Sequence, residues 1–75
     1  MTRLSSQDRS ILAVLDSAQP ATVAELAAVL ESRPHPMTVE RRCQALQQAG
    51  YLNRGPGGAY RLTRAGASRR QTAAD

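Results

Sequence analysis

The sequence is poor in large aromatic side chains: it contains no phenylalanine or tryptophan and only two tyrosines. A core must therefore be built from leucine, valine, isoleucine and alanine, which favours packed helices over a β-sandwich. The chain has 75 residues. A domain of this size buries only about 60% of the surface that its unfolded chain exposes. We expect one small, mainly helical domain that has no enclosed catalytic pocket, is not an enzyme and holds no cofactor.

Cysteine and long apolar runs are also scarce. The single cysteine, Cys43, excludes an intramolecular disulfide and is typical of a reducing compartment. One histidine, His35, and one cysteine cannot complete a structural zinc site. The first ten residues lack the apolar stretch of a signal peptide, and the runs Ile11–Leu15 and Leu26–Leu30 are far too short to span a bilayer. We expect a soluble cytoplasmic protein with no membrane partner and no metal.

Lysine is absent, so all ten basic residues are arginine, and they are unevenly distributed. Residues 1–40 contain three arginines and five acidic residues, a net charge of −2. Residues 41–75 contain seven arginines and one aspartate, a net charge of +6. A phosphate backbone is the commonest partner of such a surface, although an arginine-rich composition also follows from genomic base composition. We expect the functional surface in the second half of the chain.

Three segments carry apolar residues at helical spacing. The first is expected at about Ser6–Ser17, with a capping serine at its start and an acidic residue in its first turn. The second is expected from Val23, because Thr22–Glu25 has the pattern of a capping box. The third is expected at Pro36–Ala49, since proline is accepted in the first turn of a helix, and His35 helps to cap it.

A glycine-rich hairpin is expected after the third helix. Gly50 supplies the left-handed position that ends the helix. Tyr51–Arg54 and Ala59–Leu62 then extend on either side of a turn over residues 53–58. Ala21-Thr22 has the length of a very short strand that pairs with this hairpin, and Thr63 caps a final helical turn through residue 67.

The apolar spacing also predicts the core. Cys43 falls on the apolar stripe of the third helix, so we interpret it as a small core residue rather than a redox sensor or a nucleophile paired with His35. The predicted core consists of Ile11, Leu12, Leu15, Leu26, Val29, Leu30, Val39, Cys43, Leu46, Leu52, Tyr60 and Leu62.

The opposite face of the third helix is left free for a partner. It carries Thr38, Arg41, Arg42, Ala45 and Gln48. We expect the two helix arginines to contact a groove or a phosphate rather than to be only solvated charges. Arg54 and Arg61 flank the hairpin turn, and we expect them to contact phosphates or the minor groove. The glycine-rich turn is not a nucleotide-binding loop, because no Gly-Lys-Ser/Thr follows it and no helix starts after it.

With these segments in place, the chain resembles the winged helix-turn-helix domain of bacterial and phage transcriptional regulators, including the multiple-antibiotic-resistance repressor type. The likeness covers roughly Ser6–Ala67 and is carried by residues 22–28 (TVAELAA), 38–46 (TVERRCQAL), 49–52 (AGYL) and 60–66 (YRLTRAG). It implies a mainly α fold, with a three-helix core and a two- to three-stranded wing. We assign residues 1–67 to this domain and expect a disordered basic tail over residues 68–75.

The resemblance also implies a function. Helix 38–49 would enter the major groove of double-stranded DNA, and the wing over residues 53–61 would lie on the backbone. The protein is then a sequence-specific DNA-binding regulator, and its size suggests by analogy a phage or other mobile element. The connection Glu31–Met37 is longer than the usual turn, and Arg42 stands where family members often have an apolar residue. The long dimerisation helices of larger regulators are absent, so the resemblance does not decide whether the protein forms a homodimer.

Two other functions use the same arginines. One is a protein-interaction module that binds an acidic protein partner, and the other is recognition of structured RNA. An exposed, uninterrupted strip from Thr38 to Gln48 would favour DNA, whereas an apolar patch on the first helix or the wing would favour a protein.

Overall fold

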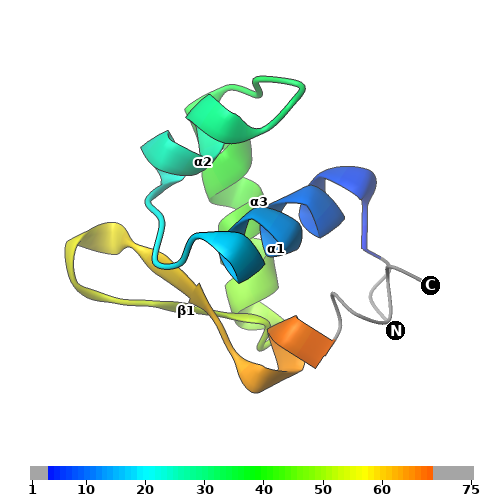
Figure 1. Cartoon of the computed structure of the whole chain (residues 1–75), viewed down its shortest axis with the longest axis vertical. Helices are drawn as coiled ribbons and strands as arrows, with labels where there is room; N and C mark the ends of the chain where they lie inside the picture. The colour runs from blue at the N-terminus through cyan, green and yellow to red at the C-terminus, as the bar shows by residue number, and fades with distance from the viewer. Residues whose placement is uncertain (1–3, 69–75) are drawn as a thin grey trace.

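The computed structural model describes residues 4–68, which form a mainly helical arrangement with a small antiparallel hairpin (Figure 1). The helices are α1 (Ser6–Ser17), α2 (Val23–Val29) and α3 (Pro36–Gln48). The predicted bounds of α1 and the predicted starts of α2 and α3 are confirmed. The expected basic tail lies outside the described residues, apart from its first residue, Ser68.

Each helix begins where a side chain caps its first turn. At α1 the hydroxyl of Ser5 accepts the backbone N–H of Asp8 at 3.0 Å, and the Asp8 carboxylate accepts the Ser5 N–H at 3.1 Å. Thr22 and Glu25 form the same reciprocal capping box at α2. At α3 the Nδ1 atom of His35 accepts the backbone N–H two residues later at 3.1 Å, which confirms the histidine as a cap. These bonds satisfy helix-start donors that have no partner within the helix.

The hairpin follows α3 directly. Gly50 has a φ of 88°, the left-handed conformation that glycine adopts without a steric penalty, and it turns the chain out of α3. Strand β1 (Leu52–Arg54) then pairs antiparallel with β2 (Tyr60–Leu62). The turn between the strands includes the short 3₁₀ helix η1 (Pro56–Gly58). The predicted hairpin is therefore present.

Two contacts attach the hairpin to the connection between α1 and α2. Ala21 and Tyr60 exchange backbone hydrogen bonds of 3.1 and 2.8 Å, so the expected third strand is present as a single bridge. The side-chain oxygen of Gln19 accepts the backbone N–H of Leu62 at 2.8 Å. Both ends of β2 are thereby joined to the connection between α1 and α2.

A last helical turn over residues 64–68 follows β2, and contacts of Thr63 hold it beside the end of α3. The Thr63 hydroxyl accepts the Gly66 N–H at 3.0 Å, as expected for a cap, and donates to the carbonyl oxygen of Gly50 at 2.6 Å. A Cβ atom at Gly66 would collide with the carbonyl oxygen of Tyr51. This close approach requires glycine at position 66.

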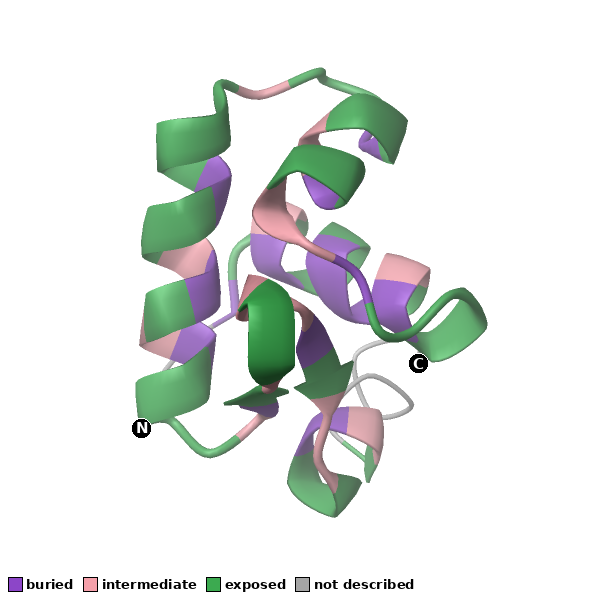
Figure 2. Cartoon of the chain, turned by 90° about the vertical axis from the view of Figure 1, so that its left-hand side faces the viewer, coloured by how far each residue is buried: buried purple, intermediate pink, exposed green. Residues whose placement is uncertain are grey.

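The core lies between the three helices and is closed by the hairpin (Figure 2). Exposed residues follow the outer sides of the helices, and buried residues follow their inner sides. The buried apolar residues are Leu4, Ile11, Leu12, Leu15, Ala21, Leu26, Leu30, Val39, Cys43, Leu46, Leu52 and Tyr60.

The core prediction is wrong at Val29, whose side chain is 60% exposed. Helix α2 is only seven residues long, and only one side of it faces the core. The buried residues on that side are Leu26 and, at the C-cap, Leu30. Leu62 is partly buried and packs against the core rather than within it. Leu4 joins the core although its sequence context indicates no periodic element.

Leu46→Ala should lower the free energy of unfolding by about 2 to 5 kcal/mol, because it leaves a cavity in the core beside α3. Val29→Ala removes a side chain from an exposed position, so it should change the value by less than about 0.5 kcal/mol. Urea unfolding followed by circular dichroism measures both. Equal effects of the two substitutions would contradict this placement of the core.

Candidate nucleic-acid interface

The predicted face of α3 divides into an exposed part and a half-buried part. Thr38, Arg41 and Gln48 are exposed, and Ala45 between them is half-buried. These four residues, which we term the α3 strip, follow one another at spacings of three and four and so lie along one side of the helix. Within residues 4–68, Arg41 forms no ion pair. The strip therefore presents one uncompensated guanidinium between polar side chains.

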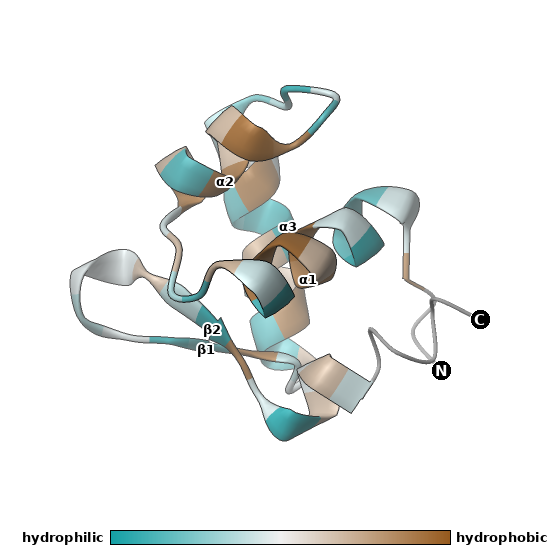
Figure 3. Ribbon diagram, in the orientation of Figure 1, coloured by the Kyte–Doolittle hydropathy of each residue, from teal (hydrophilic) through white to brown (hydrophobic). Residues whose placement is uncertain are grey.

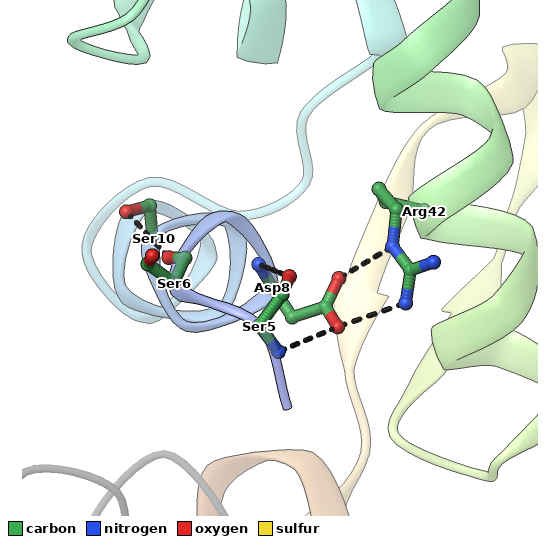
Figure 4. A network of polar contacts seen from close by, with 5 residues as sticks. All are labelled: Ser5, Ser6, Asp8, Ser10 and Arg42. Carbon is green, nitrogen blue, oxygen red and sulfur yellow. Dashed lines mark hydrogen bonds and ion pairs between the residues drawn. The ribbon is translucent and has the colours of Figure 1, made fainter. Parts of the chain in front are cut away.

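Arg42 is placed differently from Arg41. It is half-buried at the border between α3 and α1, where its Nε and Nη2 atoms donate to the two carboxylate oxygens of Asp8 at 2.8 and 2.9 Å (Figure 4). The Arg42 side chain is 37% exposed and that of Asp8 only 1%. The sequence predicts a free arginine here, and the structure corrects that expectation. Arg42 precedes Cys43 and lies beside the core stripe, so its side chain reaches α1.

Asp8 is the functional candidate that the sequence does not reveal. It lies 34 residues from Arg42, and no spacing rule joins residues so far apart. Its only local signal is the capping box with Ser5, which explains an acidic residue at this position without any long-range partner. The burial of Asp8 and its contact with α3 follow from how α1 packs.

Opposing effects set the ionisation of Asp8. Burial by itself raises the pKa of the carboxyl, because it removes the charge from water. The hydrogen bonds from Arg42 and Ser5, together with the charge of Arg42, outweigh this effect and hold the pKa of Asp8 below its ordinary value of 3.8. The same contacts raise the pKa of the Arg42 guanidinium. Both groups are therefore charged at neutral pH.

The side chains of the two hairpin arginines, Arg54 and Arg61, lie on opposite faces of the hairpin. Asn53 pairs with Arg61, and Arg54 pairs with Tyr60. Directly opposed residues of antiparallel strands point to the same side, and neighbours along a strand point to opposite sides. Arg54 and Arg61 are both exposed, and neither forms an ion pair within the described part of the chain. Arg61 thus lies on the outer face of the hairpin, and Arg54 lies at the exposed end of the face that also carries the buried residues Leu52 and Tyr60.

The Arg54 guanidinium lies over the hairpin turn. Its Nη2 atom is 3.4 Å from the position that a Cβ atom would take at Gly58, which has a φ of 77°. Glycine at this position provides both the backbone conformation and the space beside the arginine. In Figure 3 the turn of the hairpin is close to neutral in hydropathy, and the two strands combine hydrophilic and apolar stretches.

Cys43 lies within the core and takes no part in this surface. Burial raises the pKa of its thiol to about 11, so the reactive thiolate is scarce at neutral pH. The interpretation of Cys43 as a core residue is confirmed. Among residues 4–68, no three histidine, cysteine, aspartate or glutamate side chains are placed to hold a metal ion.

An open groove of about 720 Å³ lies between α1 and α2. Its lining is mostly small and apolar, with Glu25 and Ser17 as polar members. The residues that line it from α1 and α2 include Ala13, Val14, Ala28 and Val29, none of which belongs to the buried stripes in the core. The groove is therefore an apolar surface on α1 and α2, the kind of patch that we associate above with a protein partner, and it is separate from the α3 strip.

The sequence matches no model of a protein family and no curated protein. Within the described residues, no helix has the length and apolar character needed to cross a membrane. The assignment of a functional surface therefore rests on the placement of the arginines.

Arg42→Leu should lower the free energy of unfolding at pH 7 by about 1 to 3 kcal/mol, because it leaves a buried carboxylate without its main partner. The folded-state pKa of Asp8 lies below its unfolded value, so the stability from this pair is present above about pH 4 and is lost as the pH falls through the folded pKa. The difference between the wild type and the variant should therefore shrink on acidification.

Arg41→Leu is the matched control, because it removes the same charge from the neighbouring residue but breaks no ion pair. Its effect on the free energy of unfolding should be small and nearly constant between pH 7 and pH 3. Chemical denaturation at several pH values provides the comparison. A pH-independent difference for Arg42→Leu would exclude a stabilising pair in solution.

Proposed function

We propose that the protein is a sequence-specific double-stranded DNA-binding protein, a small transcriptional regulator of the winged helix-turn-helix type. In this proposal α3 enters the major groove and the hairpin acts as the wing. The observation that carries it is the exposed, unpaired Arg41 on the α3 strip, combined with a free arginine on each face of the adjoining hairpin. Arginines in such positions suit a ligand that has phosphates on both sides of a groove.

The chemistry of the α3 strip fits base recognition. The major groove is wide enough for an α-helix, and arginine can donate two hydrogen bonds to the O6 and N7 atoms of guanine. Thr38 and Gln48 add side chains that both donate and accept hydrogen bonds. Ala45 is short and apolar, which lets the helix approach the bases closely and contact a thymine methyl group.

The geometry of the hairpin fits backbone contact. Two short strands form a narrow arm, and Arg54 and Arg61 project from its opposite faces. If the arm lies along the DNA backbone, Arg61 on its outer face and Arg54 beside its turn would each meet a phosphate. Because contacts to phosphate are the same for every sequence, the hairpin would supply affinity and α3 would supply specificity.

Binding to duplex DNA should weaken steeply with salt, because each neutralised phosphate releases condensed counterions. Arg54→Ala and Arg61→Ala should each reduce the slope of log K against log salt by about 1 and weaken binding to all duplexes alike. Arg9→Ala removes an exposed arginine from α1, outside the proposed interface, and should leave the slope nearly unchanged. Fluorescence anisotropy titrations at four salt concentrations measure these slopes. The wing assignment is excluded if both hairpin variants keep the wild-type slope.

Selection from a random duplex library should enrich one motif. On that motif Arg41→Lys should cost about 1 to 3 kcal/mol of binding free energy, while binding to unrelated duplexes stays nearly constant. The reason is that lysine keeps the charge but lacks the planar pair of donors that guanine requires. Equal affinity and selectivity of the lysine variant would show that Arg41 serves only as a charge. If the wild type selects no motif, the regulator proposal fails, and an acidic protein or a structured RNA becomes the partner to test.

A further inference from the structure

The guanidinium of Arg42 has donors that the ion pair does not use. Arginine carries five N–H donors, and Asp8 accepts one from Nε and one from Nη2. Figure 4 shows the remaining nitrogen, Nη1, directed away from the carboxylate. The side chain as a whole is 37% exposed, and Asp8 occupies only one edge of the guanidinium. The pair therefore leaves Arg42 able to bind an acceptor.

The orientation of Arg42 is set from α1. The Asp8 side chain is 1% exposed, and its Oδ2 atom also accepts the backbone N–H of Ser5 at 3.1 Å. The carboxylate is thus held by the start of a 12-residue helix. A bidentate pair with a fixed carboxylate holds the guanidinium plane in one direction. A side chain that is already ordered loses less conformational entropy when it binds a ligand.

The position of Arg42 indicates which acceptor it meets. Arg42 follows Thr38 by four residues and precedes Ala45 by three, so it lies beside the α3 strip on the side that faces α1. When a helix lies in a groove, its central strip faces the base edges and its flanks face the sugar–phosphate walls. In the proposed DNA complex, the acceptor nearest this flank of α3 is a phosphate oxygen.

We propose that Asp8 is a positioning residue, which holds Arg42 at the border of α1 and α3 so that its free edge donates to one phosphate of the DNA backbone. This inference rests on the proposed DNA-binding function. Because Asp8 cancels the charge of Arg42, the contact depends on the direction of a hydrogen bond more than on long-range attraction. Arg42 therefore differs from Arg41, Arg54 and Arg61, whose charges are uncompensated within the described residues.

Asp8→Asn separates positioning from charge. The substitution makes the protein more positive by one unit, so attraction alone would strengthen DNA binding. Positioning instead predicts weaker binding, by about 3- to 10-fold, which corresponds to the net contribution of one hydrogen bond. The loss should be the same for the selected duplex and for unrelated duplexes. Glu40→Gln is the matched control, because it removes an exposed carboxylate from α3 and should leave binding equal or tighter.

A second variant tests the same contact from the side of Arg42. Arg42→Lys keeps the positive charge on α3 but cannot form the bidentate pair or present the Nη1 edge. It should weaken binding to a similar extent, and combining it with Asp8→Asn should add little further loss, since both substitutions remove one contact. Circular dichroism melts establish that each variant is folded at the temperature of the titrations.

The possible outcomes are distinct. Binding by Asp8→Asn that equals or exceeds the wild type would overturn the positioning role, and so would full affinity of Arg42→Lys. A loss confined to the selected duplex would overturn the phosphate contact, because it would place Arg42 on a base. If the wild-type protein binds no duplex at all, the proposed function has failed rather than the role of Asp8.

Discussion

The buried carboxylate of Asp8 constrains how α1 packs against α3. A charge removed from water is tolerated only while its hydrogen-bonding partners stay in place. Its partners are the backbone of Ser5, at the start of α1, and the guanidinium of Arg42, in the middle of α3. Sliding one helix along the other would break these bonds. The pair therefore adds a directional polar contact to the apolar packing between α1 and α3.

The hairpin is held by a second set of polar contacts. Gln19 and Ala21 bind β2 from the connection between α1 and α2. Thr63 binds the carbonyl oxygen of Gly50 at the end of α3. These bonds come from both sides of the hairpin, so its arginines are held in a defined place relative to α3. A surface assembled from a helix and a hairpin requires such attachment, since two strands alone are at best marginally stable in water.

Four arginines of the second half of the chain consequently fall into two groups. Arg41, Arg54 and Arg61 have no acidic partner among the described residues, and their charges can attract an anion from a distance. Arg42 is neutralised by Asp8 and can act only at short range, through the direction of its remaining donors. An arginine count cannot distinguish these groups, because net charge records neither pairing nor orientation. In the proposed interface the unpaired arginines attract the DNA from a distance, and Arg42 acts through its fixed orientation beside α1.

Much of the local structure could be predicted from the sequence, because the interactions that set it join residues within four positions of one another. The capping boxes, the His35 cap and the glycine that ends α3 are of this kind. The exposure of Val29 could not be predicted, because a two-turn helix has apolar residues on neighbouring sides. Only packing against the other helices decides which side faces the core. The opposite faces of Arg54 and Arg61 depend on strand register. The pairing of Arg42 with Asp8 joins residues 34 positions apart, so it exists only because the folded chain brings α1 against α3.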